Sequence, residues 1–104
     1  MVKKINTKEF NELNDEFIVL DVFAEWCGPC KMMAPFFEEI SELDEFKNVK
    51  FCKVNVDEEE EIAELFNVSA IPTFIILKNK QEIARKLGFI PKVGLISWVK
   101  ENTK

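Results

Sequence analysis

The chain has 104 residues, of which 47% are hydrophobic and 32% charged, and this composition is typical of one globular domain over residues 1–104. It contains no His and no Tyr, which excludes His-dependent catalysis and His-ligated zinc sites. A net charge of -5 argues against nucleic acid as a partner, because phosphate backbones would be repelled on average.

The first half of the chain predicts a helix, a strand and a longer helix. Thr7 can cap a short helix that runs to about residue 15. Residues 17–24 are nearly all apolar and rich in β-branched and aromatic types, which is typical of a central strand covered on both faces. A helix with a wide apolar stripe then extends from Cys27 or Cys30 to about residue 46.

The second half predicts a helix between two strands, then a hairpin and a last helix. The three strands are expected over residues 49–56, 73–77 and 81–87. Asp57 can cap the helix that follows the first of them, Asn79-Lys80 makes the hairpin turn, and Pro91 opens the last helix. This alternation, closed by a hairpin, predicts an α/β fold in which a mixed sheet carries helices on both faces.

The beginning of the chain has no apolar core or cleavage site of a secretory signal, and no apolar stretch approaches the ~18–20 residues that cross a bilayer. Three Cys residues are an odd number and too few for a disulfide scaffold. We therefore expect a cytoplasmic protein that has no membrane partner and is monomeric.

The main chemical signal is the run Trp26-Cys27-Gly28-Pro29-Cys30-Lys31, which lies between the apolar strand and the helix that follows it. Two Cys residues at this spacing are typical of a redox site or of half a zinc site. Zinc needs four ligands, and Cys52 is the only other soft ligand in the chain, so we favour redox chemistry. Cys52 itself is expected to be a small buried hydrophobic residue.

A mechanism follows if Cys27 lies at the N-terminus of the helix. Free N–H groups and the positive end of the helix dipole would favour its thiolate, which attacks a substrate disulfide. Cys30, one turn later, then resolves the mixed disulfide. We assign Cys27 as the nucleophile because it comes first and is expected to be the more exposed of the two. Gly28 is expected to permit a sharp turn, and Pro29 to fix φ at the start of the helix.

Asp21 interrupts the apolar strand, where an unpaired carboxylate is costly to bury. If it is buried behind the Cys pair, its pKa is raised and it can accept and return the proton of Cys30. The simpler interpretation is a solvated carboxylate at the end of the sheet. Lys53, inside the next strand, is the expected charge partner of Asp21, unless its side chain extends outward from the strand end.

These residues resemble the thioredoxin family almost from end to end. The resemblance is carried by residues 21–31, 34–35, 53–57, 70–74 and 88. It implies the thioredoxin fold, a four- to five-stranded mixed sheet flanked by four helices in three α/β/α layers. It also implies a thiol-disulfide oxidoreductase, a protein-disulfide reductase and electron carrier without a cofactor or metal, and this family is itself a known example of the lowered Cys pKa. The implied partners are thioredoxin reductase and disulfide-containing client proteins.

The resemblance also assigns roles to individual residues. It places Lys53 beside Asp21, and it implies that the bond between Ile71 and Pro72 is cis and that Pro72 packs against the Cys pair. The backbone of Ile71 would pair with an extended substrate segment. The expected substrate-binding residues are Trp26, Gly28, Pro29, Ile71, Pro72 and Gly88. Phe89, a single exposed apolar residue, adds less to this expectation.

The sequence departs from the family pattern at two positions that bear on the structure. Phe23 stands where Trp is frequent, and Lys80 stands where the hairpin usually has Gly, so the turn must find a positive φ elsewhere or change its type. Two alternative functions stay open. One is a thiol oxidase or isomerase on the same fold, against which Gly28-Pro29 and the missing signal argue. The other is a non-catalytic interaction subunit or a zinc-binding module.

Overall fold

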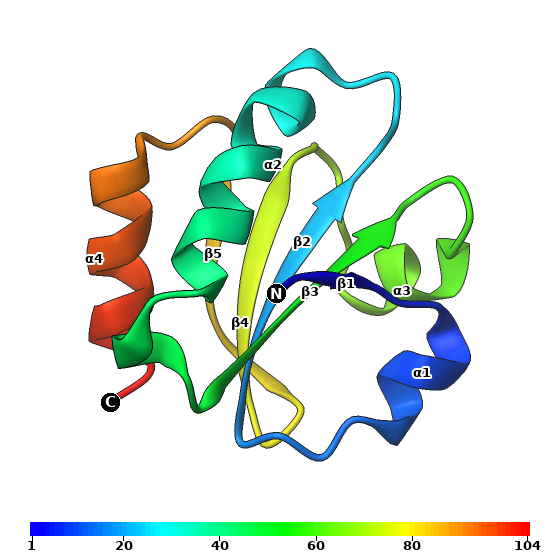
Figure 1. Cartoon of the computed structure of the whole chain (residues 1–104). Coiled ribbons are helices and arrows are strands. Elements are labelled where there is room, and N and C mark those ends of the chain that lie inside the picture. The colour runs from blue at the N-terminus through cyan, green and yellow to red at the C-terminus, as the bar shows by residue number, and fades with distance from the viewer.

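A central strand, β2 (Phe17–Phe23), organises the computed structural model, which describes residues 1–104 (Figure 1). It pairs in parallel with β3 (Val49–Asn55) and antiparallel with β4 (Thr73–Lys78). β5 (Gln81–Leu87) lies antiparallel beyond β4, and the two-residue β1 (Lys3–Lys4) pairs in parallel with β3 at the other edge. The mixed sheet therefore has five strands in the order β1-β3-β2-β4-β5.

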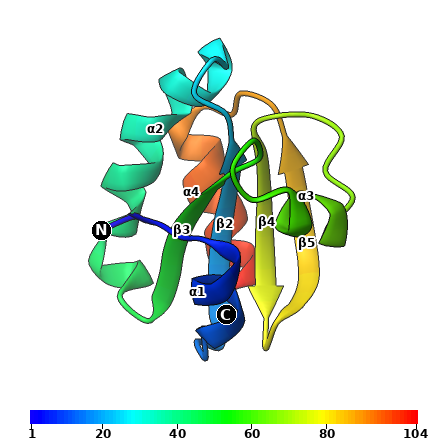
Figure 2. The ribbon, with the colours of Figure 1, turned by 90° about the vertical axis from the view of Figure 1, so that its right-hand side faces the viewer.

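Helices cover both faces of this sheet (Figures 1 and 2). α1 (Thr7–Glu12) and α3 (Glu60–Leu65) pack on one face, and α2 (Gly28–Ser41) and α4 (Lys92–Asn102) pack on the other. A 3₁₀ turn, Asp44–Phe46, follows α2. The predicted three-layer α/β/α fold is confirmed. None of the helices is long and apolar enough to pass through a membrane.

Two clusters of eleven buried side chains each fill the space between the sheet and its helices. Alternate residues of β2 enter different clusters: Leu20 faces α1 and α3, whereas Val19 faces α2 and α4. Phe37 of α2 contacts Phe51 and Phe74, with ring centroids 5.4 and 5.7 Å apart. Because both faces of β2 are covered, its sequence is apolar at every position except Asp21 and shows no alternation with polar residues.

The helices on the α1 and α3 face begin later or end earlier than predicted. Asn6, not Thr7, caps α1, because its side chain accepts the N–H of Glu9 while the Glu9 carboxylate accepts the N–H of Asn6. α1 then ends at Glu12, about one turn before the predicted end. α3 begins at Glu60, so the prediction that Asp57 caps this helix is wrong.

The helices on the other face also differ from prediction at their ends. α2 stops at Ser41, and the last predicted turn forms the separate 3₁₀ segment. Pro91 is the N-cap of α4 and not its first residue. The missing N–H of Pro91 still costs no helical hydrogen bond at that position.

The β4–β5 hairpin turns at Asn79 and Lys80, which both have positive φ values, of 50° and 72°. A two-residue type I′ turn needs positive φ at both positions. Lys80 itself therefore adopts the conformation that we expected the turn to avoid at this residue. Its ammonium donates to the carbonyls of Phe10 and Asn11 at 2.8 and 3.2 Å, near the end of α1, and lies over the Phe10 ring. These contacts offset the strained φ.

Candidate functional site

Cys27 and Cys30 form a disulfide at the N-terminus of α2, with their Cα atoms 5.2 Å apart. Cys27 is the N-cap residue, with an extended backbone, and its carbonyl accepts the N–H of Lys31 at 3.1 Å. Its sulfur accepts the N–H of Cys30 at 3.2 Å. The Cys27 sulfur therefore lies where the free N–H groups and the positive end of the helix dipole are directed.

Two expectations about this turn are wrong. Both sulfur-bearing residues are equally buried, each 4% exposed, so exposure does not distinguish Cys27 from Cys30 in the disulfide form. Gly28 is the first residue of α2, has no positive φ, and a Cβ added there would meet no atom within 4 Å. No sharp turn requires glycine at this position, and its missing side chain leaves open space beside the disulfide. Pro29, also exposed, is the second helical residue, as expected.

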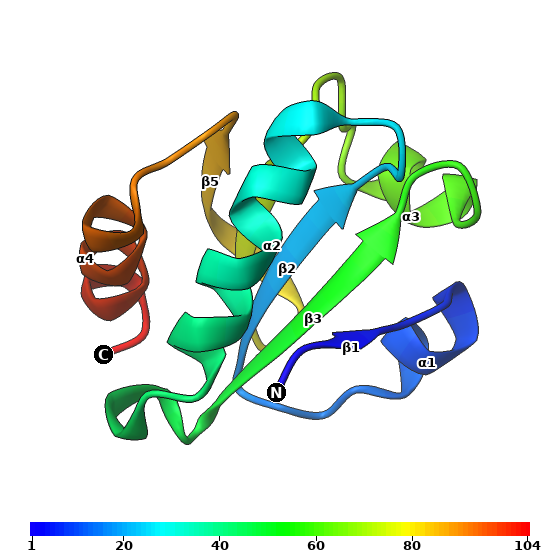
Figure 3. The ribbon, with the colours of Figure 1, turned by 45° about the horizontal axis from the view of Figure 1, so that its top comes forward.

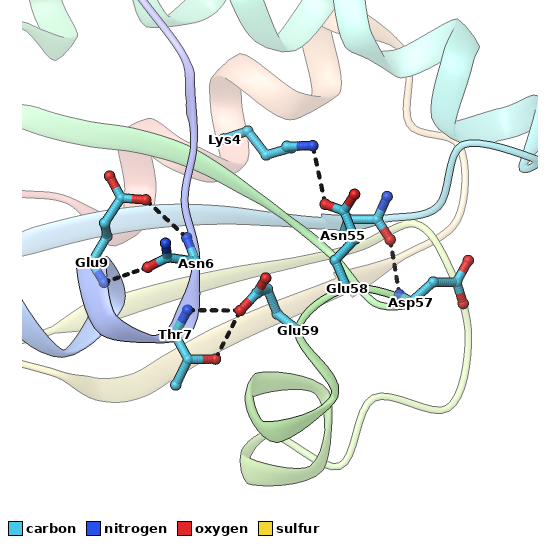
Figure 4. Close-up of polar contacts among 8 residues, drawn as sticks. All are labelled: Lys4, Asn6, Thr7, Glu9, Asn55, Asp57, Glu58 and Glu59. Carbon is cyan, nitrogen blue, oxygen red and sulfur yellow. Dashed lines mark hydrogen bonds and ion pairs between the residues drawn. The ribbon is translucent and has the colours of Figure 1, made fainter.

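Trp26 immediately precedes the disulfide and is 69% exposed. Its indole N–H donates to Oδ2 of Asp57 at 2.9 Å. Asp57 is held in turn, because its backbone N–H donates to the side-chain oxygen of Asn55 at 2.8 Å (Figure 4). Asp57 thus orients Trp26 instead of capping α3. A partner 31 residues away leaves no periodic signal in the sequence, and we did not predict this contact.

The loop from Asp57 onward is also tied to the beginning of the chain (Figure 4). Thr7 donates its N–H and its hydroxyl to the Glu59 carboxylate, at 2.9 and 3.1 Å. Lys4 forms an ion pair with Glu58 at 3.0 Å. These contacts fix β1 and α1 against the segment that holds Trp26 in place.

Asp21 lies within β2 and is 3% exposed, and its Oδ1 accepts no hydrogen bond from the protein. Burial raises the pKa of this carboxyl from 3.8 to about 7, and the charge of Lys53 opposes the shift. Lys53 lies on β3 directly beside Asp21, its partner in the register of β2 and β3, as predicted. Its ammonium, however, lies over the Phe23 ring, 5.4 Å from the centroid, and forms no ion pair with Asp21.

A pocket of about 120 Å³ connects Asp21 with Cys30. It is lined by Asp21, Phe23, Ala24, Glu25, Cys30, Lys31, Ala34 and Lys53. The volume is sufficient for several water molecules, and the lining supplies polar groups to hold them. A proton can therefore pass between the buried carboxyl and the second cysteine through water. Glu25 and Lys31 were not predicted to take part in this site.

A further part of the site is formed by Ile71, Pro72 and Gly88. The Ile71–Pro72 peptide bond is cis, and Ile71 packs against the small cluster of Ala24, Cys27 and Cys30. Gly88 has a φ of 81° and donates its N–H to the Pro72 carbonyl at 2.8 Å. The N–H and C=O groups of Ile71 have no partner within the chain. They are free to pair with an extended segment of another polypeptide.

No group of three or more Cys, Asp or Glu side chains comes together closely enough to hold a metal ion. Cys52 is buried in the core cluster that faces α1 and α3, whereas the disulfide belongs to a separate small cluster with Ala24. Burial raises the pKa of the Cys52 thiol to about 12.

Comparison with known proteins identifies the family. The thioredoxin family model matches residues 1–101. The thioredoxin of Rickettsia bellii is 38% identical, over 98% of this chain and 99% of its own length. The chain belongs to the thioredoxin family. As a thioredoxin with an intact Cys27–Cys30 disulfide, it is a thiol-disulfide oxidoreductase that reduces protein disulfides.

Solved structures agree with this assignment. The thioredoxin of Malassezia sympodialis has a TM-score of 0.91 and 36% sequence identity, covering 100% of this chain and 92% of that one. The solution structure of the oxidised thioredoxin from Plasmodium falciparum has a TM-score of 0.88 and 36% identity, covering 100% of both chains. The thioredoxin fold is thus shared over the full length of this chain.

Proposed function

We propose that this thioredoxin uses Cys27 as its nucleophile and Cys30 as its resolving thiol. The observation that carries the proposal is the position of the Cys27 sulfur at the N-cap of α2, where it accepts the Cys30 N–H at 3.2 Å. A negative charge on this sulfur is stabilised by the helix N-terminus. The same environment raises the fraction of Cys27 that is present as the thiolate, which is the form that attacks a disulfide.

The reaction proceeds in two exchanges. The Cys27 thiolate forms a bond with one client sulfur, and the other client sulfur leaves as a thiolate and takes a proton. The Cys30 thiolate then attacks Cys27, the Cys27–Cys30 disulfide closes, and the first client sulfur is released. Two electrons pass from the protein to the client disulfide, which becomes two thiols.

Asp21 supplies the proton transfer that the second exchange needs. Cys30 must lose its proton before it can attack, and Asp21 shares a pocket with it. A carboxyl whose pKa is about 7 can accept a proton near neutral pH and give it back. The charge of Lys53, on the neighbouring strand β3, lowers the free-energy cost of ionising the buried Asp21 carboxyl, although the two side chains form no ion pair.

Clients dock around the disulfide on the predicted surface. The free N–H and C=O of Ile71 pair with an extended client segment, and the exposed Trp26 ring covers one side of it. Pro72 and Gly88 hold the Ile71 segment in place, since they are joined by a hydrogen bond. Gly28 and Pro29 leave the approach to the disulfide uncovered.

Thioredoxins as a family work with disulfide-containing proteins and with thioredoxin reductase. The same partners are proposed for this chain, with residues 1–104 acting as one domain, a monomer in the cytoplasm that needs no cofactor. The net charge of -5 supports the absence of a nucleic-acid partner.

Reduction of insulin disulfides with a dithiol as electron source tests these roles. Cys27→Ser and Cys30→Ser should each abolish catalysed reduction, and Cys27→Ser should also prevent formation of a mixed disulfide. Cys52→Ser is the matched control, because Cys52 lies outside the site, and it should keep the activity. An inactive parent protein, or a Cys27→Ser variant that still forms the mixed disulfide, would contradict the proposal.

A further inference from the structure

Three apolar side chains outside the proposed reaction form a strip along one side of the disulfide site. Met32 is 59% exposed and Phe89 is 46% exposed, and Phe36 is partly buried against the core cluster that faces α2 and α4. The Phe36 and Phe89 rings contact each other, with centroids 6.2 Å apart. Met32 and Phe36 are four residues apart on α2 and share one face of it. We call these three residues the aromatic rim.

The rim is continuous with the disulfide along α2. Gly28, Met32 and Phe36 follow one another at intervals of four residues, so they form one row that begins at the active turn. At about 1.5 Å of rise per residue, Phe36 lies about 12 Å along the helix from Gly28. The row therefore leads away from the Cys27 sulfur on the outer surface of the helix.

The rim is also continuous with the segment that receives the client. Phe89 directly follows Gly88, whose N–H is bound to the carbonyl of Pro72. The next residue, Ile90, donates its N–H to the Met33 sulfur at 3.4 Å, which fixes this segment against α2. Figure 3 shows the connection between β5 and α4 beside α2. Phe89 is thus held between the client-binding segment and the helix that carries the disulfide.

We propose that the aromatic rim is a subsite for an apolar side chain of the client, about four residues away from the client cysteine that Cys27 attacks. The inference rests on the proposed function, because it takes the client to be an extended polypeptide that lies over Cys27 and Ile71. An extended chain advances about 3.3 Å per residue, so about four residues span the ~12 Å from Gly28 to Phe36. Aromatic side chains and Met offer a large apolar contact to such a residue.

A set of single-cysteine peptides in mixed disulfide with thionitrobenzoate tests the subsite. In each peptide either Phe or Ser stands three, four or five residues before or after the cysteine. The rate constant kcat/KM for attack by the reduced protein is read from release of the coloured thiol. We expect a Phe peptide to react about fivefold to tenfold faster than its Ser counterpart at one of the positions about four residues away, because its side chain is removed from water.

The ratio of the Phe rate to the Ser rate is compared between variants, which cancels any change in the reactivity of Cys27 itself. Phe89→Ala and Met32→Ala should reduce the ratio toward one. Ile83→Ala is the matched control, since Ile83 has the same 46% exposure as Phe89 but lies on β5. It should keep the parent ratio.

The failures of the two proposals can be distinguished. Equal rates for Phe and Ser peptides in an active parent protein, or an undiminished ratio in Phe89→Ala, would overturn the subsite alone. A reduced parent protein that reacts neither with these peptides nor with insulin would overturn the proposed function and the subsite with it.

Discussion

Replacing Asp21 with Asn is expected to stabilise the folded protein at alkaline pH and to slow its turnover. The Asp21 carboxyl is buried and its Oδ1 has no hydrogen-bond donor from the protein, so the ionised form loses most of its water without gaining a protein partner. Burial raises the pKa of this group from 3.8 to about 7, although the Lys53 charge opposes the shift. Asn has nearly the same shape and does not ionise.

The size of the effect follows from these two pKa values. Between them the folded protein binds more protons than the unfolded chain, so the free energy of unfolding falls as the pH rises. The loss begins near 3.8 and is complete just above the folded pKa of about 7. At about 1.4 kcal/mol for each pH unit, the ionised carboxylate costs about 4 kcal/mol at alkaline pH. The buried Asn amide leaves polar atoms unsatisfied, at a cost of about 1–3 kcal/mol.

Asp21→Asn should therefore be more stable than the parent by about 1–3 kcal/mol at around pH 9 and no more stable than it at around pH 4. Urea unfolding of the disulfide forms across this range measures the difference. Asp15→Asn is the control, because Asp15 is exposed, and its difference from the parent should vary little with pH. A stability difference for Asp21→Asn that is the same at both ends of the range would refute the argument. An unchanged rate of insulin reduction across pH 6–8 would remove the role of Asp21 in proton transfer.

Three other changes test the packing, the hairpin and the third thiol. Phe37→Ala should lower the free energy of unfolding by about 3–5 kcal/mol in urea, because Phe37 is fully buried against two other rings, and a loss under about 1 kcal/mol would contradict the described core. Lys80→Met should lower the free energy of unfolding by about 1–2 kcal/mol, because its two hydrogen bonds to carbonyls are lost. Lys80→Gly should lower it by less, since glycine adopts the positive φ without strain. Equal losses in the two variants would show that the positive φ does not affect stability here. In the reduced protein at about pH 8, iodoacetamide should modify Cys27 quickly and Cys52 only after unfolding, because burial raises the Cys52 pKa to about 12. Mass spectrometry showing that Cys52 reacts as fast as Cys27 would disprove this.

The parts of the fold that the sequence predicts are those fixed by long apolar patterns. Residues 17–24 are apolar except for Asp21 because helices cover both faces of β2, as is typical of a central strand. The two-residue strand β1 could not be predicted, because Lys3 and Lys4 form it only by pairing with β3. The cap of α1 was a choice between neighbouring polar residues, and the position of Glu9 favoured Asn6.

In the candidate site, too, the sequence predicts the residues that have a local signal and misses the contacts made between distant parts of the chain. The Cys pair and its place after a buried strand are local signals, and Asp21 stands out because a carboxylate interrupts that strand. Asp57 shows where local rules fail: it is well placed to cap a helix, but the indole of Trp26 offers a better partner from a distant part of the chain. The position of Lys53 over Phe23, and not in an ion pair with Asp21, depends on side-chain geometry that no spacing encodes.

The two edge strands of the sheet, β1 and β5, limit how this thioredoxin can pair with other polypeptides. Strand β1 consists only of Lys3 and Lys4, and strand β5 carries the charged residues Glu82, Arg85 and Lys86. Short, charged borders discourage a foreign strand from joining and copies of the same chain from stacking into fibrils. The unpaired main-chain groups of Ile71 are therefore the place where we propose that an extended client segment pairs, next to the disulfide cluster.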